Sequence, residues 1–322
     1  MLIFSLLALL AWSGSDLFSK KGTREEDQNS HWKVVFGVGL IMGVHFVITL
    51  IGGAIIDANG GPDALPKILA SLLYTDFKPI DFVHYLPVAV LYILAMVLGY
   101  IGLRYIELSI SSPICNCSGS LALLLCALIF GTDEFALPAL AIVGVVLVTL
   151  GILGMGIVDG REDEQLKLQR REASNRKYTK SILAFLLPIA YLVIDALGTV
   201  GDEWIFAEGL IEDYAANSAF ELTFFLLAIF AFVWVKFVKK DHLFVRENGD
   251  LYLGGLCETI GQIFYMAVMF AEYAVGMVII SAYCVLSLVW SRIFLKEKLS
   301  LNHYITIVVT LVGIMLLAVY GG

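Results

Sequence analysis

Runs of about 20 apolar residues recur along the whole chain, separated by short polar stretches. A helix that crosses the hydrocarbon core of a bilayer needs roughly 20 predominantly apolar residues. The 322 residues are 59% hydrophobic and 16% charged, with a mean hydropathy of +0.87. Ordinary soluble proteins carry about 25% charged residues, which cover their surface. The sequence therefore predicts an all-α integral membrane protein.

The apolar runs predict ten transmembrane helices. By apolar length they cover 2–20, 32–56, 80–103, 108–130, 136–158, 181–200, 214–237, 250–270, 274–295 and 301–320. The first run, MLIFSLLALLAW, has no basic segment before it and no small-residue cleavage site after it. We expect it to be the first spanning helix and not a removable signal peptide.

The basic residues predict the orientation of the chain. Of the 21 Lys and Arg residues, all but Lys67 and Lys78 lie in or beside the stretches that follow odd-numbered spans. Lys and Arg are enriched in cytoplasmic loops, so these stretches are predicted to be cytoplasmic and both termini to lie outside. The longest polar stretch, 159–180, is then a solvated cytoplasmic linker. We expect a multi-pass protein of a bacterial-type plasma membrane.

The two halves of the chain resemble each other. The stretch IFGTDEFAL at 129–137 aligns with IFLKEKLSL at 293–301. Three further pairs follow at similar offsets: Trp12 with Tyr191, Asp16 with Asp195, and Tyr100 with Tyr265. We predict a first five-helix repeat at 1–158, the charged linker at 159–180 and a second five-helix repeat at 181–322. A repeat with an odd number of helices is inverted relative to its copy, an architecture that recurs in secondary transporters.

Three short motifs add a family resemblance. They are LLAWSGSDLFSK at 9–20, RYIELSISSP at 104–113 and FLKEKLS at 294–300. The chain resembles the drug/metabolite transporter superfamily, in particular its ten-helix EamA-like branch. The resemblance implies the fold and transport but no particular substrate. The chain departs from the family at Asp16, where an apolar residue is usual, and at Lys296, where glycine is usual. It also departs in orientation, because better-known relatives have both termini in the cytoplasm.

Four acids lie inside predicted spans: Asp16, Asp195, Glu221 and Glu258. Ionisable groups inside a bilayer are costly, so each is a candidate for binding a proton or a cationic substrate. Glu258 shares a helix face with Gln262 and Tyr265, and the alternative for this stripe is an interhelical hydrogen bond. Asp16 has a second interpretation, an ion pair with Lys20 one turn later. Glu221 lies near the end of its span and is expected to extend outward.

Polar and aromatic residues complete the predicted site. Asn116 is an amide in the middle of the fourth span, three residues after Pro113, and we expect it to face a central cavity. The aromatic residues expected to line that cavity and to stack on an organic cation are Trp12, Tyr100, Tyr191 and Tyr265.

These observations predict a secondary transporter that works by alternating access. We expect it to export a small amine, amino acid or organic cation, coupled to protons or to another gradient. An uptake permease for a neutral metabolite such as a sugar is the alternative within transport. A membrane-embedded enzyme or a structural membrane protein is the alternative of another class.

The sequence does not contain the motifs that would indicate nucleotide binding, metal binding or nucleic-acid binding. The chain has no GxxxxGK[ST] phosphate-binding loop, and its five histidines form no HExxH motif. The five cysteines are an odd number without a CxxC pair, so we expect packing residues and neither a metal site nor a disulfide. No basic patch interleaved with aromatic residues indicates nucleic acid. We expect no cofactor, and either a monomer or a homodimer.

Overall fold

Helices make up all the regular structure in the described part of the chain. This computed structural model describes residues 2–24, 26–130, 138–161, 182–270, 276, 279–280 and 282–320, and no strand occurs among them. In chain order the elements are α1 (Leu2–Gly22), α2 (Ser30–Ala58), η1 (Pro62–Ala64), α3 (Lys67–Leu73), α4 (Pro79–Gly102), α5 (Leu108–Cys115), α6 (Ser118–Ile129), α7 (Ala139–Arg161), α9 (Ile182–Ala207), α10 (Asp213–Val233), the π-helical turn η2 (Trp234–Val238), η3 (Arg246–Asn248), α11 (Gly249–Phe270), α13 (Tyr283–Phe294) and α14 (Leu301–Tyr320).

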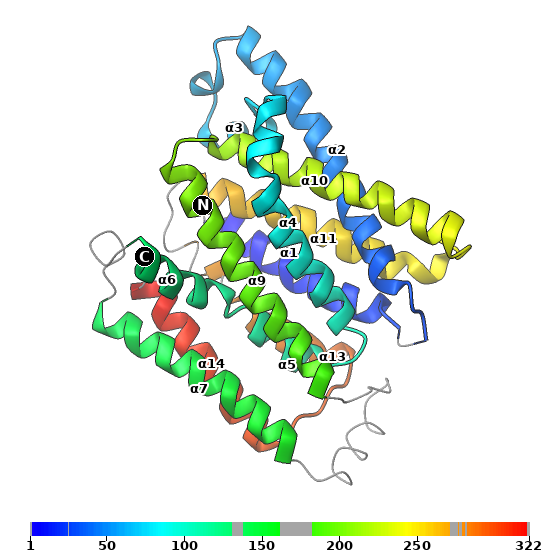
Figure 1. Cartoon of the computed structure of the whole chain (residues 1–322), viewed down its shortest axis with the longest axis vertical. Coiled ribbons are helices and arrows are strands. Elements are labelled where there is room, and N and C mark those ends of the chain that lie inside the picture. The colour runs from blue at the N-terminus through cyan, green and yellow to red at the C-terminus, as the bar shows by residue number, and fades with distance from the viewer. Residues whose placement is uncertain are drawn as a thin grey trace.

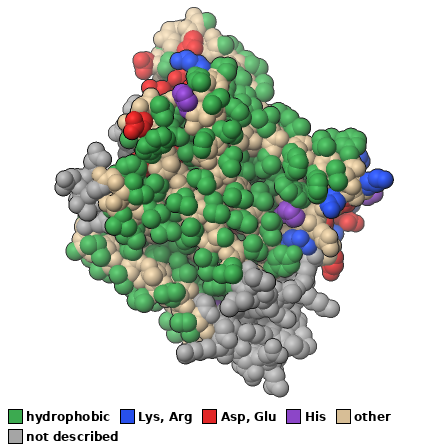
Figure 2. Space-filling view, in the orientation of Figure 1, with side chains coloured by type: hydrophobic (Ala, Val, Ile, Leu, Met, Phe, Trp, Pro, Cys, Tyr) green, Lys and Arg blue, Asp and Glu red, His purple; other side chains and the backbone are tan. Residues whose placement is uncertain are grey.

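The chain is a multi-pass membrane protein. Seven of the described helices are long and apolar enough to cross a bilayer: Leu2–Gly22, Ser30–Ala58, Pro79–Gly102, Leu108–Ile129, Ala184–Ala207, Asp213–Val238 and Arg246–Met269. Three shorter apolar helices, Ala139–Met155, Tyr283–Phe294 and Leu301–Leu317, fall within the fifth, ninth and tenth predicted spans. The number ten therefore stays a prediction. Figure 2 shows apolar side chains across the middle of one face, with charged side chains gathered toward its edges.

Helices from the two halves of the chain pack as pairs. The most extensive contacts join α1 to α11, α2 to α10, α4 to α9, and α7 to α14, and Figure 1 shows α7 and α14 side by side. Glycines allow these close approaches. A Cβ at Gly39 of α2 would lie 2.4 Å from the carbonyl oxygen of Phe224 of α10. A Cβ at Gly151 of α7 would lie 2.0 Å from Oγ1 of Thr310 of α14. Small residues at such contacts are typical of helix pairs in membranes.

The junctions between helices gather at two ends of the molecule. At one end, which we call the basic end, the stretches 23–29, 103–107, 239–248 and 295–300 lie together. Lys20 Nζ donates hydrogen bonds to the carbonyl oxygens of Leu103 and Ile106, at the end of α4. Glu297 accepts hydrogen bonds from the backbone amides of Leu108 and Ser109, at the start of α5, both at 3.0 Å. The four stretches all follow odd-numbered predicted spans.

The opposite end, which we call the far end, contains the stretches 59–78 and 208–212. Thr75 donates to the carbonyl oxygen of Tyr214 at 3.3 Å, and Ser218 donates to Thr75 at 2.7 Å. His84 contacts the carbonyl oxygen of Leu210 at 3.0 Å. These stretches follow even-numbered predicted spans, so the described junctions after odd-numbered and even-numbered spans lie at different ends of the molecule.

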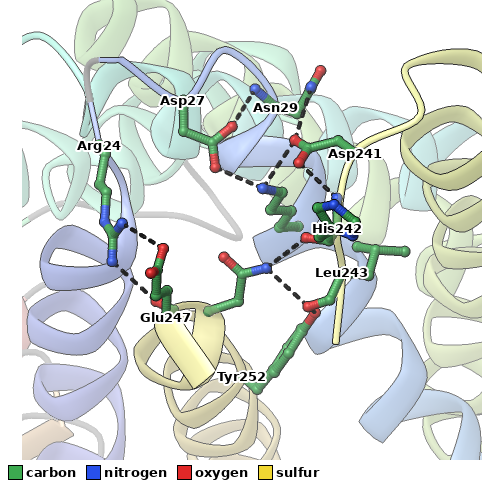
Figure 3. Close-up of polar contacts among 10 residues, drawn as sticks. Arg24, Asp27, Asn29, Asp241, His242, Leu243, Glu247 and Tyr252 are labelled. Atoms are coloured by element: carbon green, nitrogen blue, oxygen red, sulfur yellow. Dashed lines mark hydrogen bonds and ion pairs between the residues drawn. The ribbon is translucent and has the colours of Figure 1, made fainter. Parts of the chain in front are cut away.

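A polar network fastens the loop after α1 to the loop after α10 at the basic end (Figure 3). Lys33 Nζ forms ion pairs with Asp27 at 2.8 Å and with Asp241 at 2.9 Å, and its side chain is only 5% exposed. Arg24 pairs with Glu247 at 3.2 Å. We call Asp27, Lys33 and Asp241 the loop clasp. Burial raises the pKa of Asp241, but the hydrogen bonds from Lys33 and Asn29 outweigh it, so the pKa is lowered.

The boundaries of two predicted spans differ from those of the helices in the structure. The sixth span was expected to end at 200, but α9 continues to Ala207 and includes Asp202. The fourth span is broken, because α5 ends at Cys115 and α6 begins at Ser118. The segment 131–137 of the repeat alignment, nearly all of the linker 159–180 and the first residues of the ninth span lie outside the described residues.

Candidate functional site

A cavity of about 670 Å³ lies between the helices of the two halves. Its walls come mainly from α1, α4, α5, α6, α9, α10 and α11. All nine residues predicted for substrate or proton binding line it. Ligand-binding pockets usually measure roughly 300–1,000 Å³, so this cavity suits a small organic molecule. The structure therefore locates these residues at one cavity, and their role in binding stays a prediction.

Asp16 is held at the junction of three helices. It lies on α1, and its Oδ2 accepts hydrogen bonds from the hydroxyl groups of Ser112 of α5 at 2.5 Å and Ser287 of α13 at 2.7 Å. The alternative partner, Lys20, directs its ammonium group to the carbonyl oxygens of Leu103 and Ile106. Two hydroxyl donors fix the carboxylate while part of it remains exposed to the cavity.

Two further acids lie on other walls of the same cavity. Asp195 of α9 shares a hydrogen bond with Ser118, the first residue of α6. Glu258 of α11 shares a hydrogen bond with Ser15 of α1. Each acid therefore has one hydroxyl partner from a neighbouring helix, which positions the carboxylate without neutralising its charge.

Aromatic rings form part of the wall around these acids. The ring of Trp12 lies 5.1 Å from that of Tyr265 and 5.7 Å from that of Tyr283, measured between centroids. Tyr191 packs its ring against Gly99, where an added Cβ would come within 3.0 Å of the ring. The hydroxyl of Tyr100 and the indole nitrogen of Trp12 are buried, with no hydrogen-bond partner among the described residues.

Asn116 lies at the break between α5 and α6. α5 contains Pro113, and Asn116 follows its last residue. The side chain of Asn116 shares a hydrogen bond with Cys284 at the start of α13. Asn116 and Cys117 keep right-handed helical backbone angles, so the interruption is a short irregular turn within one spanning helix.

The sequence analysis missed a second group of polar residues in the cavity. Asp202 of α9 accepts a hydrogen bond from the hydroxyl of Tyr92 at 2.5 Å and shares another with Tyr85. Its other oxygen, Oδ1, is buried without a partner in the described part of the chain. The signal was present, because Asp195, Thr199 and Asp202 share one helix face at i, i+4 and i+7. Ending the sixth span at 200 hid it.

The charge of the cavity has one sign. Five carboxylate residues line it: Asp16, Asp195, Asp202, Asp213 and Glu258. No Lys, Arg or His occurs among the described lining residues. In a low-dielectric interior, such a set of acids attracts cations or protons strongly.

The cavity is closed at the basic end. There it is lined by Ser19, Leu103 and Leu108, which are all buried. The lining extends toward the far end as far as Asp213, which is exposed. The lining is thus buried at the basic end, and the exposure of Asp213 favours entry of a ligand from the far end.

The prediction that Glu221 extends outward is wrong. Its side chain is 0% exposed, and its Oε1 lies 2.7 Å from Nδ1 of His45 of α2. Asn217, one turn earlier on α10, donates to the same oxygen at 3.3 Å. Gln262, a predicted site residue, donates to Asn217 at a longer 3.4 Å. The predicted stripe on α11 thus reaches a buried histidine–carboxylate pair that the sequence did not reveal.

The described residues contain no metal site. No group of three or more His, Cys, Asp or Glu residues among them has the geometry to hold a metal ion. The five cysteines are free thiols in this structure.

Comparisons with known proteins leave the family open. A scan against protein-family models and a search of curated proteins find no match to the chain.

Proposed function

We propose that the chain is a secondary transporter that carries a small organic cation across the membrane by alternating access. The observation that carries this proposal is the lining of the cavity, where five carboxylate residues occur without a described Lys, Arg or His. A cation that entered would replace its lost hydration with these charges. Binding of a neutral sugar would not offset the free-energy cost of keeping several acids in the membrane.

The aromatic wall supports an organic cation over an inorganic one. Trp12, Tyr265 and Tyr283 form one cluster beside the acids. Aromatic faces attract ammonium and guanidinium groups through their quadrupole, by about 0.5–2 kcal/mol each. The cavity is also larger than a bare metal ion needs.

The helix pairs support the predicted inverted repeat. The predicted repeat makes α1 equivalent to α9, α2 to α10, α4 to α11 and α7 to α14. When each helix is exchanged for its equivalent, the contact between α1 and α11 becomes the contact between α9 and α4, and both contacts occur. The same exchange returns α2–α10 and α7–α14 to themselves. An inverted repeat with its site between the halves is suited to alternating access, because each half can exchange roles with the other. This arrangement also agrees with the proposed membership of the EamA-like branch.

The predicted orientation would give the cavity a direction across the membrane. If the basic end is cytoplasmic, as the charge bias predicts, the cavity faces outward in this conformation and is sealed toward the cytoplasm. Release of a cation to the outside, driven by inward movement of protons, is the export cycle that we propose for it.

Binding of defined probes tests the proposal. The purified protein in nanodiscs is titrated with tetramethylammonium, putrescine, alanine and glucose, followed by calorimetry. Asp16→Asn and Asp195→Asn keep the side-chain shape and remove the charge. Glu208→Gln, at an exposed position outside the cavity, is the matched control.

We expect at least one of the two cations to bind, and each Asn variant to weaken it by tenfold or more, about 1.4 kcal/mol. Glu208→Gln should bind like the wild type. Binding of glucose that both Asn variants leave unchanged would replace the proposal by a neutral-metabolite permease. Liposomes loaded with the bound cation then measure whether it crosses.

A further inference from the structure

The pair of Glu221 and His45 lies outside the cavity lining and is buried between α2 and α10. The ring of His45 has two contacts. Nδ1 lies 2.7 Å from Oε1 of Glu221, and Nε2 lies 3.2 Å from the carbonyl oxygen of Leu72 in the last turn of α3. The histidine therefore bridges α10 and α3.

These two contacts fix the number of protons. A carbonyl oxygen only accepts, so Nε2 must carry a hydrogen to bond with Leu72. The 2.7 Å contact then needs a second hydrogen, either on Nδ1 facing a carboxylate or on Glu221 facing a bare Nδ1. A neutral imidazole beside an ionised carboxylate has only one hydrogen for two acceptors. The observed arrangement therefore holds one proton more than that state.

Burial of the Glu221–His45 pair also favours the state with the extra proton. With the extra proton the pair has no net charge, and without it the pair has a charge of −1. Glu221 is fully buried, and its Oε2 has no hydrogen-bond partner among the described residues. An uncompensated charge is costly at such a position, so the pair is built to take up a proton.

Other titratable groups on the surrounding helices have contacts elsewhere. Tyr74, after α3, and Tyr214 of α10 place their rings 5.4 Å apart at the far end. Tyr92 of α4 donates to Asp202, and Glu258 of α11 lines the cavity. Among the described side chains, His45 and Glu221 are each other's ionisable neighbours.

Proton occupancy has structural consequences in two directions. Loss of the proton leaves His45 with a single N–H, so it must release either Leu72 or Glu221. Release of Leu72 would loosen α3 from α2 at the far end, where the cavity is accessible. Toward the cavity, Asn217 and Gln262 extend the hydrogen bonds from Glu221 to the lining.

We propose that Glu221 and His45 form a proton-binding site, separate from the acids of the cavity, whose occupancy controls the attachment of α3 at the far end. Its use as the site of the coupling proton rests on the proposed transport function. The proton site itself does not depend on any substrate.

Nuclear magnetic resonance of the histidine nitrogens tests the site directly. The protein is labelled with ¹⁵N-histidine, placed in nanodiscs without substrate and titrated from pH 5 to 9. His45→Gln identifies the signals of His45, and exposed His242 is the internal reference. Glu221→Gln is the decisive variant, because its amide can donate to a neutral Nδ1 while it cannot bind a proton.

In the wild type at pH 6, we expect Nε2 of His45 to be protonated and Nδ1 to be protonated or strongly hydrogen-bonded. A rise in pH should release one proton. In Glu221→Gln, His45 should be neutral at pH 7 and should not titrate. An Nδ1 that neither carries a proton nor accepts a hydrogen bond in the wild type at pH 6 overturns the proposal without any need for the variant to fold. Identical His45 titrations in wild type and Glu221→Gln overturn it as well.

Hydrogen exchange measures the attachment of α3. Exchange of the backbone amides at 69–77 in the wild type is compared with that in Glu221→Gln at each pH. We expect wild-type protection to fall by about fivefold relative to the variant once the proton leaves, from the loss of one hydrogen bond. An unchanged ratio across the range overturns the control of α3.

Neither readout uses a substrate, so the two proposals fail separately. Absence of cation binding removes the transport function and leaves the proton result standing. Cation binding together with an Nδ1 of His45 that neither carries a proton nor accepts a hydrogen bond removes only the proton site.

Discussion

Glu297 accepts hydrogen bonds from both the backbone N–H and the hydroxyl group of Ser109, at 3.0 and 2.7 Å, across 188 residues of sequence. The carboxylate is 2% exposed and lies at the first turn of α5, where helix amides lack partners within the helix. A negative charge at this end is also favoured by the helix dipole. The glutamate of the FLKEKLS motif is thus a helix cap that joins the two halves of the chain.

Replacing this cap should destabilise the fold. Glu297→Ala leaves the amides of Leu108 and Ser109 buried and unpaired, so we expect a loss of about 1–3 kcal/mol in the free energy of unfolding. Ser109→Ala removes only the hydroxyl bond and should lose about 1 kcal/mol. Thermal unfolding in detergent measures both. Equal melting temperatures for wild type and Glu297→Ala would show that the cap contributes nothing.

The group around Asp202 should contribute to cation binding. Asp202→Asn keeps the bond from Tyr92 but removes a charge from the cavity, so we expect affinity for tetramethylammonium or putrescine to fall about tenfold. Tyr92→Phe removes one hydrogen-bond donor and should have a smaller effect, about fivefold or less. Calorimetric titration of both variants checks the order. A larger effect of Tyr92→Phe than of Asp202→Asn would indicate that the tyrosine itself contacts the ligand.

The loop clasp should stabilise the protein above the pH at which aspartate protonates. The pKa of Asp241 is lowered in the folded state, so its contribution is complete above the ordinary value of about 3.9 and is lost as the pH falls through the folded value. Asp241 is 28% exposed, so solvent screening limits the contribution to about 1 kcal/mol. Melting of wild type and Asp241→Asn should differ at pH 7 and converge below pH 4. A difference that grows on acidification would contradict the assignment.

Glycines at close helix–helix contacts should not tolerate replacement by a residue with a side chain. Gly39→Ala places Cβ 2.4 Å from a backbone oxygen of α10, which cannot rotate away, so we expect a loss of about 1–3 kcal/mol. Gly119 of α6 has nothing within 4 Å of an added Cβ. Gly119→Ala should therefore be neutral or stabilise by up to about 1 kcal/mol, through the greater helix propensity of alanine. Thermal unfolding compares the two.

The orientation predicted from basic residues can be checked in cells. Single cysteines at Lys239, at the basic end, and at Glu208, at the far end, are introduced after the five native cysteines are replaced. Both positions are exposed. An impermeant maleimide should label the cysteine at 208 in intact cells and the one at 239 only after permeabilisation. The reverse pattern would place both termini in the cytoplasm.

Sequence reasoning reached the helices and the walls of the cavity because both leave local signals. Apolar length located the spanning segments, and the cost of an acid in a bilayer singled out Asp16, Asp195 and Glu258. Asp202 was missed because its acidic neighbours made the end of α9 look like a loop. The partnership of His45 with Glu221 joins positions 176 residues apart, and no local pattern could indicate it. The helix break beside Asn116 was suggested by Pro113, but its position depends on packing against other helices.

The seal at the basic end also bears on how this protein tolerates sequence change. Lys20 and Glu297 both bind backbone atoms of the α4–α5 junction, and Glu297 also binds the hydroxyl of Ser109. Any residue other than proline at 108 supplies the same amide, and any residue at 103 or 106 supplies the same carbonyl oxygen. These backbone contacts can therefore persist when the junction residues are substituted, whereas replacing Lys20 or Glu297 removes them. A survey of natural variants can therefore test whether Lys20 and Glu297 vary less than the residues whose backbone they bind.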